Sequence, residues 1–292
     1  KTFESNEQIA FDSVSMTADR GYLVRGRSGT TRAVLVKFTA KGEILWSKIF
    51  NDLPHWSIIS QPVSDGIILA SARVPVRIFK VNDSGSVVWK KSLEINGFFL
   101  QSMGASSDNG VILAGKSSHK ITLVQINPDG DVDWTAAYLL KDRLYDISSV
   151  ARTSDRGYVV SGTRYSDESY ETAGGFFIKL DSKQELVFQK KFGRTDRKEY
   201  AGQIFPTTNA SYVIFGFSVE ESDLHTLFLN VNSEGVVPNC GFFDHLSVKK
   251  MSSPHVRSQN RGIFSRDFTL SSHSIDVSQA ISASSSFMAC RE

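Results

Sequence analysis

Residues 108–118, "DNGVILAGKSS", contain the clearest chemical motif of the chain, because Gly110 to Ser117 reads GxxxxGKS. In a phosphate-binding loop this spacing places a flexible turn between a strand and a helix, so that backbone N–H groups bind phosphate. Here the residues between the two glycines are Val-Ile-Leu-Ala, which favour a strand, and "SSHKITLVQI" follows in place of a helix. The N–H groups of a strand pair with the neighbouring strand. We therefore expect this motif to bind no nucleotide.

The other residues capable of chemistry are scattered. The histidines do not pair at a metal-binding spacing, and His119 and His225 are expected in surface loops between second and third strands. "NPDGDVDW" offers Asp129, Asp131 and Asp133, but it lacks the 12-residue loop and terminal Glu of an EF-hand. No GxSxG motif occurs, and no Cys and His are spaced as a nucleophile and its base. The sequence thus predicts no catalytic, cofactor-binding or metal-binding residues.

The GxxxxGKS segment is part of an internal repeat that occurs five times in the sequence. The copies begin "MTADRGYLVRG", "PVSDGIILASA", "ASSDNGVILAGK", "RTSDRGYVVSGT" and "PTTNASYVIFGF". Later in each copy a turn residue precedes an anchor residue by four positions; the turn residues are Gly42, Gly85, Gly130, Gln184 and Gly235, and the anchors are Trp46, Trp89, Trp134, Phe188 and Asn239. Repeats of roughly 40–50 residues indicate stacked supersecondary units.

Each copy predicts two β-hairpins and hence four short strands. The first hairpin turns at Asp-Arg-Gly, Asp-Gly or Asp-Asn-Gly, where we expect Gly to adopt a positive φ, and the second turns at sequences such as "TAKG" and "NPDG". The runs between the turns are rich in Val, Ile, Leu, Phe and Tyr. This pattern predicts an all-β fold, a β-propeller of four-stranded blades, with six blades favoured. The anchor tryptophans are expected in outermost strands, packed between neighbouring blades.

We expect residues 1–292 to form a single β-propeller domain, with recognisable repeats in residues 1–245. Residues 246–292 alternate polar and apolar residues in places but show no clear turn anchors. Two alternatives stay open for them, a degenerate last blade or an irregular C-terminal strap. Lys1, Thr2 and Phe3 match the end of a repeat, as in "SKIF" and "KKF". They predict a strand that closes the ring with the C-terminal segment or enters the open blade of a neighbouring copy.

Composition and charge exclude several classes of partner. The chain has 33 Lys and Arg against 31 Asp and Glu, a net charge of +2, which argues against a nucleic-acid partner. No apolar run approaches the roughly 20 residues of a membrane-spanning helix, so we expect no membrane insertion. The start "KTFESNEQ" is compatible with an exported, processed protein and equally with a trimmed chain. Cys240 and Cys290 predict one disulfide in an oxidising compartment, with two buried thiols as the alternative.

The stretch "SDRGYVVSG…FFIKLDSKQELVFQKKF" resembles the repeats of exported bacterial and archaeal β-propeller proteins, which are related in pattern to the quinoprotein-like propellers. In that group a copy runs from a Ser-Asp-Gly-Gly-Tyr turn to a Trp-x-Lys-x-Phe strand. The resemblance covers about residues 8–245 and implies propeller architecture. The acidic, amide and aromatic groups that surround the cofactor in the quinone enzymes cannot be placed in this sequence, so the resemblance implies no cofactor.

Charged residues mark a candidate docking face. The loops that join second and third strands should emerge on one face, which would be basic in the early blades and acidic in the later ones. The basic residues are Arg25, Arg27, Arg32, Arg73, Arg77, Lys116 and Lys120, and the acidic residues are Asp167, Glu168, Glu171, Glu220, Glu221 and Asp223. Such a dipolar surface fits a protein partner or another copy of the chain, although solvated loop charge is the alternative.

The sequence therefore favours a non-enzymatic structural, assembly or protein-binding module, extracellular or at the cell surface, that can self-associate into filaments. The alternative is an enzyme or small-ligand-binding propeller that uses the central channel.

Overall fold

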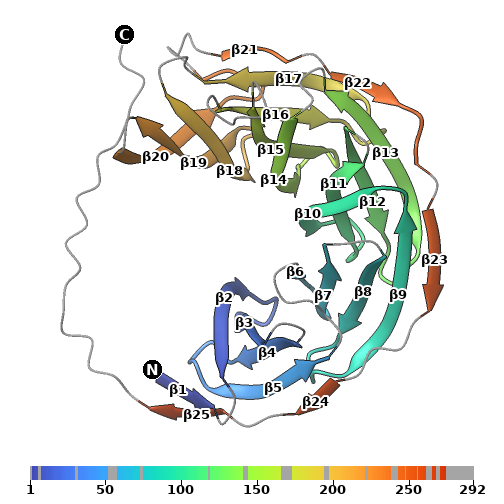
Figure 1. The fold of residues 1–292 in the computed structure, drawn as a ribbon, viewed down its shortest axis with the longest axis vertical. Coiled ribbons are helices and arrows are strands. Elements are labelled where there is room, and N and C mark those ends of the chain that lie inside the picture. Colours follow the sequence, from blue (N-terminus) through green and yellow to red (C-terminus); the bar gives the residue numbers. More distant parts are fainter. Residues whose placement is uncertain are drawn as a thin grey trace. The chain divides into compact units, whose positions relative to one another are not determined.

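The computed structural model describes residues 2–5, 8–29, 32–51, 58–72, 75–117, 119–140, 144–165, 173–193, 197–220, 223–237, 243–246, 248–254, 256–260, 265–267 and 270–273 (Figure 1). Every regular element in them is a β-strand, which confirms the predicted all-β class. The described residues form two compact units. Unit 1 holds those of Lys1–Glu94, Pro128–Asp131 and Val256–Ala283, and unit 2 holds those of Ile95–Asn127 and Val132–His255.

Unit 1 contains the first two repeats as separate blades. The first blade has the order β2 (Ile9–Met16), β3 (Tyr22–Ser28), β4 (Arg32–Phe38), β5 (Ile44–Phe50) and β24 (Ser265–Asp267). The second has the order β6 (Ile58–Val63), β7 (Gly66–Ser71), β8 (Val76–Val81), β9 (Val87–Ile95) and β23 (Val256–Asn260). A separate pair joins β1 (Thr2–Ser5) to β25 (Leu270–His273), antiparallel, with Phe3 opposite Ser272.

Unit 2 contains the other three repeats. The third blade has the order β10 (Phe98–Ala105), β11 (Val111–Ser117), β12 (Lys120–Ile126), β13 (Val132–Leu140) and β22 (Val248–Met251). The fourth has the order β14 (Leu144–Arg152), β15 (Tyr158–Tyr165), β16 (Ala173–Leu180), β17 (Leu186–Phe192) and β21 (Phe243–His245). The fifth has three described strands, β18 (Lys198–Pro206), β19 (Tyr212–Glu220) and β20 (Asp223–Val231).

The fold is thus a β-propeller of mainly four-stranded blades. The favoured number of six blades is wrong for the described residues, which form five blades and the two-stranded pair β1–β25. The reason lies in how residues 243–273 are used. They do not build a hairpin-linked blade of their own, because four of their five short strands lie at the edges of the first four blades and the fifth, β25, pairs only with β1.

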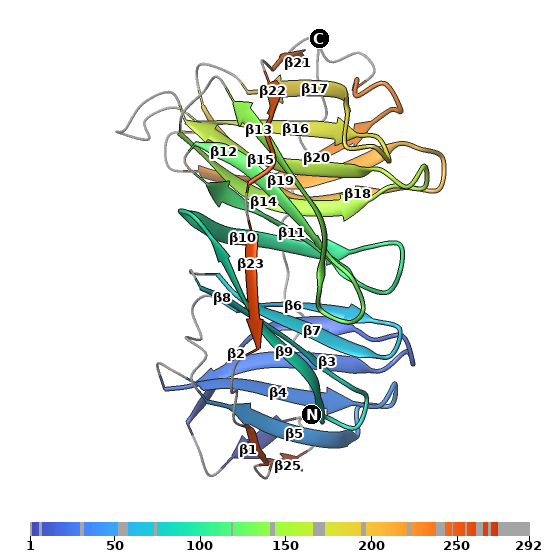
Figure 2. The ribbon, with the colours of Figure 1, turned by 90° about the vertical axis from the view of Figure 1, so that its right-hand side faces the viewer.

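These five strands, β21 to β25, are called the strap here. In unit 2, β21 pairs antiparallel with β17 and β22 pairs antiparallel with β13. In unit 1, β23 lies beside β9 (Figure 2). The strand β24 pairs with β5, and β25 pairs with β1. The strap meets the blades in the reverse of their sequence order and covers the outer edge of the fourth strand in each of the first four blades. Edge coverage removes unpaired backbone groups that would otherwise template aggregation.

The hairpin turns differ in one respect from the expectation. In the first turn of the first and fourth repeats the positive φ falls on the residue before glycine, at Arg20 (64°) and Arg156 (66°), whereas in the second repeat Gly66 itself has a φ of 145°, as expected. Gly21 and Gly157 are required for space, because a Cβ there would lie 2.3 Å and 2.0 Å from carbonyl oxygens of the third strand. The second turns follow the expectation, with φ between 77° and 84° at Gly42, Gly85, Gly130 and Gly235 and 60° at Gln184.

The anchor residues lie in the fourth strands and pack between blades, as predicted, and their contact there is with the turn of the next repeat. Within unit 1, the indole N–H of Trp46 donates to the carbonyl of Asp83, and that of Trp89 donates to the carbonyl of Pro128, both at 2.7 Å. Within unit 2, a Cβ added to Gly235 would lie 2.9 Å from the ring of Phe188. The repeated aromatic residue and the repeated turn therefore form one structural contact.

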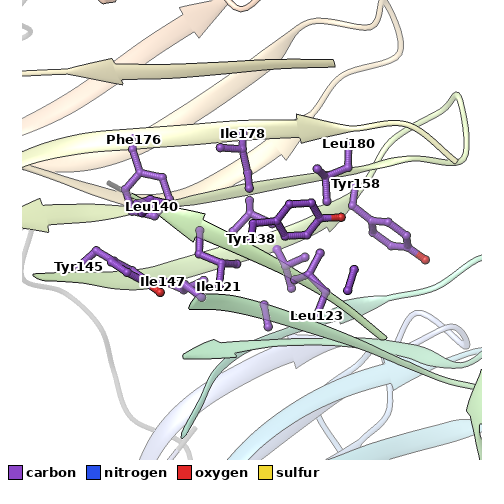
Figure 3. Close-up of a cluster of buried hydrophobic side chains, with 14 of the residues drawn as sticks. Ile121, Leu123, Tyr138, Leu140, Tyr145, Ile147, Tyr158, Phe176, Ile178 and Leu180 are labelled. Carbon is purple, nitrogen blue, oxygen red and sulfur yellow. The ribbon is translucent and has the colours of Figure 1, made fainter. Parts of the chain in front are cut away.

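A buried apolar cluster holds the third and fourth blades together (Figure 3). Tyr138 from β13 and Phe176 and Ile178 from β16 are fully buried in it, and the ring of Tyr145 packs edge-on against Phe176 at 6.1 Å. Leu246, between β21 and β22 of the strap, is 2% exposed in the same cluster. The strap is thus anchored in the core of unit 2 as well as paired to its edges.

Candidate docking surface

The sheet β18–β19–β20 has two apolar faces of very different exposure. Side chains alternate across a strand, so Ile214 and Leu229 point to one face while Phe215 and Phe228 point to the other. The first face is buried against Phe177 and Phe192 of the fourth blade. The second face carries most of the large exposed hydrophobic residues of unit 2.

This second face is called the aromatic face here. It is defined by five residues and their relative exposures: Phe205 (54%), Phe215 (48%), Phe217 (41%), Leu224 (71%) and Phe228 (52%). The strand register places them in cross-strand rows: Phe215 lies opposite Phe228, and Phe217 lies opposite Tyr200, whose ring stacks on it at 4.5 Å. The apolar side chains therefore form a continuous surface and are not single exposed residues.

The fourth blade shows what such a face becomes when it has a neighbour on each side. Phe176 and Phe177 of β16 point to opposite faces of that sheet, and both are fully buried. Phe176 packs toward the third blade and Phe177 toward the fifth. By comparison, the aromatic face has the composition of a blade-to-blade interface without the burial of one.

Charged residues lie at the β19–β20 end of the same sheet, and strand alternation places Glu220 and Asp223 on the side of Ile214 and Leu229. The guanidinium Nη1 of Arg197 lies 3.2 Å from a carboxylate oxygen of Glu220, the last residue of β19. Asp223 begins β20 directly opposite Glu220. Both were expected in a loop of the candidate docking face, and the structure places them at the ends of paired strands. Strand pairing therefore fixes the positions of these two acidic residues.

The basic candidates in unit 1 also lie in strands and not in loops. Arg25 and Arg27 belong to β3, Arg32 begins β4, and Arg77 belongs to β8. The Nε of Arg25 lies 2.9 Å from a carboxylate oxygen of Asp12, and the Nε of Arg32 donates to the carbonyl of Ser28 at 3.2 Å. These interactions reduce the charge that the side chains can offer to a partner.

Lys116 of the GxxxxGKS motif lies in a strand, as predicted, because β11 spans Val111–Ser117. Its Nζ donates to the carbonyl of Tyr145 and to Asp146, both at 2.7 Å. Gln101, at a β-bulge of β10, also donates to Asp146 at 2.8 Å. Burial alone would raise the pKa of Asp146, but the hydrogen bonds from Lys116 and Gln101 hold it below its ordinary value. This lysine joins two blades of unit 2. Lys120, the first residue of β12, lies just after the same hairpin.

Several predicted site residues lie outside the described residues. They are Lys1, Arg73, Asp167, Glu168, Glu171, Glu221, Cys240 and Cys290. The predicted disulfide and part of the charged docking face therefore stay predictions. Thr2 and Phe3 are described, and they pair with β25 as stated above.

The residues weighed as metal ligands have other roles where they are described. Asp131 accepts from Lys91 at 2.5 Å, and Asp133 accepts from Gln125 at 3.2 Å. His225 lies within β20 and not in a loop, whereas His119 lies just before β12. Across the described parts of the chain, no three His, Cys, Asp or Glu residues gather as they would around a metal ion. A search of the same residues for a helix that is long and apolar enough to cross a membrane found none.

Sequence reasoning did not single out the aromatic face. The runs "YVIFGF" and "TLFLNV" place apolar residues on both sides of their strands, but so does "GGFFIKL" in the fourth blade, where both sides are buried. The sequence signal is the same in the two cases. What distinguishes the fifth blade is that no other described sheet of unit 2 packs against the aromatic face, which no local pattern encodes.

Comparison with known proteins supports the fold alone. The chain is similar to the crystal structure of a protein of unknown function from Bacteroides caccae, with 17% sequence identity, a TM-score of 0.50, and coverage of 79% of this chain and 80% of that one. A glycosyl hydrolase from Bacteroides ovatus matches with 7% identity and a TM-score of 0.33, over 77% of this chain and 84% of that one, a likeness too weak for inference. Family models and curated proteins gave no match.

Proposed function

We propose that this protein is a non-enzymatic, exported structural module that binds protein surfaces, including other copies of itself. The observation that carries the proposal is the aromatic face of β18–β20, where Phe205, Phe215, Phe217, Leu224 and Phe228 are each between 41% and 71% exposed. Soluble proteins seldom expose contiguous apolar patches unless a partner covers them. Aromatic residues are also enriched in the cores of protein interfaces.

The geometry of the face supports a flat protein partner. The aromatic side chains project from paired strands, so their positions are fixed before binding and little entropy is lost when a partner covers them.

The test compares two substitutions of equal exposure. Phe228→Glu places a charge at the centre of the aromatic face, where Phe228 is 52% exposed, and Leu45→Glu does the same on β5, where Leu45 is 54% exposed. We expect sedimentation velocity over a range of protein concentrations to show self-association of the wild type. Phe228→Glu should weaken it at least about tenfold, a change of about 1.4 kcal/mol, and Leu45→Glu should leave it unchanged.

A folded Phe228→Glu variant that associates like the wild type would contradict the proposal. So would an equal loss in both variants, because the effect would then not belong to the aromatic face. Circular dichroism of each variant checks that the sheet is intact.

A further inference from the structure

One position of the repeat faces the preceding blade. It is the first residue of the second strand, and Tyr158 and Tyr212 occupy it in the fourth and fifth blades. Tyr158 is 3% exposed in the cluster between the third and fourth blades, with its ring 5.8 Å from that of the anchor Trp134 (Figure 3). Tyr212 is also 3% exposed, and its ring lies 6.0 Å from that of the anchor Phe188. A tyrosine at this position therefore packs on the anchor residue of the blade before it.

A second position of the repeat faces the following blade. It is the fourth residue from the end of the third strand, and its occupants include Leu35, Leu123 and Phe177. All three are fully buried, each in a cluster that also contains residues of the next blade. Phe228 occupies the same position in the fifth blade and is 52% exposed. The aromatic face is thus the half of the repeated interface that accepts a following blade.

The first blade exposes the other half of this interface. Tyr22 begins β3, the position of Tyr158 and Tyr212, but it is 41% exposed. Strand pairing places Tyr22 beside Met16 on the side of the sheet that points away from the second blade. We call this surface the first-blade face and define it by Tyr22 and three further exposed residues, Phe11 (43%), Val14 (66%) and Met16 (68%).

The two faces match in chemistry as well as in their place in the repeat. The central rows of the aromatic face pair Phe215 with Phe228 and stack Phe217 on Tyr200. The rows of the first-blade face run from Met16 to Tyr22 and Phe38, and from Val14 to Val24 and Val36. These rows contain no charged side chain, so contact between them would bury no unpaired charge. Methionine also adapts its shape to aromatic rings and packs favourably against them.

We propose that the aromatic face of one copy packs against the first-blade face of the next copy, as one blade of the repeat packs against the blade that follows it. The inference rests on the proposed function and names the surface that the aromatic face binds. The contact joins two different surfaces, so every added copy exposes one new face of each kind. Association of this head-to-tail type continues into a filament or closes into a ring.

The test blocks each face separately. Val14→Glu places a charge on the first-blade face, and Val88→Glu is its control on β9, where Val88 is 56% exposed. By sedimentation velocity, we expect Val14→Glu to weaken self-association at least about tenfold, as Phe228→Glu does, while Val88→Glu leaves it unchanged. Circular dichroism checks that each variant keeps its sheets.

An equimolar mixture of the two face variants supplies the decisive measurement. The Phe228→Glu chain keeps an intact first-blade face, and the Val14→Glu chain keeps an intact aromatic face. We therefore expect the mixture to form one-to-one dimers and nothing larger, at concentrations where each variant alone stays monomeric. A mixture that stays monomeric would overturn the inference.

The two proposals fail separately. If Phe228→Glu weakens association and Val14→Glu does not, the proposed function stands and the head-to-tail inference is wrong, because the aromatic face then binds some other surface, such as a second aromatic face. If Val14→Glu weakens association and Phe228→Glu does not, the aromatic face is not the interface and both proposals are wrong. A wild type that stays monomeric at every concentration would also overturn both.

Discussion

A buried lysine recurs at one position of the repeat and is paired with an aspartate each time. Lys37, Lys80 and Lys179 are each the next-to-last residue of a third strand, and their side chains are 1%, 5% and 4% exposed. Each Nζ lies within 2.8 Å of an aspartate oxygen from the first hairpin turn of the same blade, at Asp19, Asp65 and Asp155 respectively. Burying a cation is unfavourable unless it is paired, so the two positions depend on each other.

The third repeat keeps the aspartate, as Asp108, without a lysine, whereas the fifth repeat lacks both charges. The third repeat has the neutral Gln125 at the lysine position, and Gln125 accepts a hydrogen bond from Tyr158 at 2.7 Å. The fifth repeat has Asn230 at the lysine position and Asn209 at the aspartate position, so both charges are absent together. The pair is thus a structural element of the blade and not a candidate catalytic group.

The Lys37–Asp19 pair predicts a loss of stability in acid. The hydrogen bond from Lys37, followed by that from Thr17, lowers the pKa of Asp19 to about 2 from an ordinary 3.8. Because the folded-state pKa is the lower one, the stabilisation is complete above about pH 4 and is lost as the pH falls through about 2. Asp19→Asn should therefore reduce the dependence of the unfolding free energy on pH between 5 and 2, measured by urea denaturation.

The control for this prediction is a double substitution. At pH 7, Asp19→Asn alone leaves a buried cation without its counter-ion and should cost about 1–3 kcal/mol. Asp19→Asn combined with Lys37→Gln removes both charges, as in the fifth repeat with Asn209 and Asn230, and should recover part of that loss. A double variant that is less stable than the single one would show that Lys37 does not depend on Asp19.

At the scale of the element, the contact between an anchor residue and the next turn is the unit that joins blades. Gly85 has a φ of 80°, and a Cβ there would lie 2.8 Å from Cε of Lys48 and 3.0 Å from Cδ2 of Trp46. Gly29 has a φ of 66°, but a Cβ there would meet nothing within 4 Å. The two glycines thus share a backbone conformation and differ in packing.

Alanine substitution at the two positions separates these effects. Gly29→Ala should cost about 1–2 kcal/mol, the strain of a left-handed conformation. Gly85→Ala should cost about 1 kcal/mol more, because Trp46 must move away from its turn. Urea denaturation followed by tryptophan fluorescence measures both, and an equal loss at the two sites would show that the contact with Trp46 contributes no stability.

The strap makes a second prediction at this scale. Leu246 is 2% exposed in the cluster between the third and fourth blades, whereas Leu139 of β13 is 37% exposed. Leu246→Ala should cost about 2–4 kcal/mol and make the strap more sensitive to limited proteolysis. Leu139→Ala should have a smaller effect on both measurements. Unchanged proteolysis in Leu246→Ala would mean that backbone pairing alone holds the strap.

The elements were predictable from sequence to the extent that the repeat is local. The hairpin turns, the strand runs and the contact of Trp46 and Trp89 with the next turn all follow from residues within about one repeat length. The reason for glycine in the first turn was misjudged, since Gly21 is needed for its proximity to the carbonyl of Phe38 and not for its φ. That contact joins a turn to the third strand, and turn rules based on neighbouring residues do not include it.

At the scale of the molecule, local sequence patterns could not predict which sheets the terminal segments of the chain would join. Residues 243–273 contain alternating segments that fit either a last blade or a strap, because both are strands with an apolar side. The choice depends on which sheet edges are open, and therefore on the arrangement of all blades. The same holds for the aromatic face, whose residues have the pattern of a buried blade surface.

The aromatic face and the charged docking face predict opposite responses of assembly to salt. Association through opposite charges, such as Arg27 and Arg77 of one copy with Glu220 and Asp223 of another, is screened by salt, since the Debye length falls from about 10 Å at 0.1 M to about 3 Å at 1 M. Association through Phe215, Phe217 and Phe228 buries apolar surface and is not weakened by screening. Because Arg25 and Glu220 already have ion-pair partners within the chain, we expect sedimentation velocity in 0.1 M and 1 M sodium chloride to show equal or stronger association at high salt. A tenfold weaker association in 1 M salt would assign the interface to the charged residues. Phe228→Glu should remove association at both salt concentrations, so this variant distinguishes the two surfaces within one experiment.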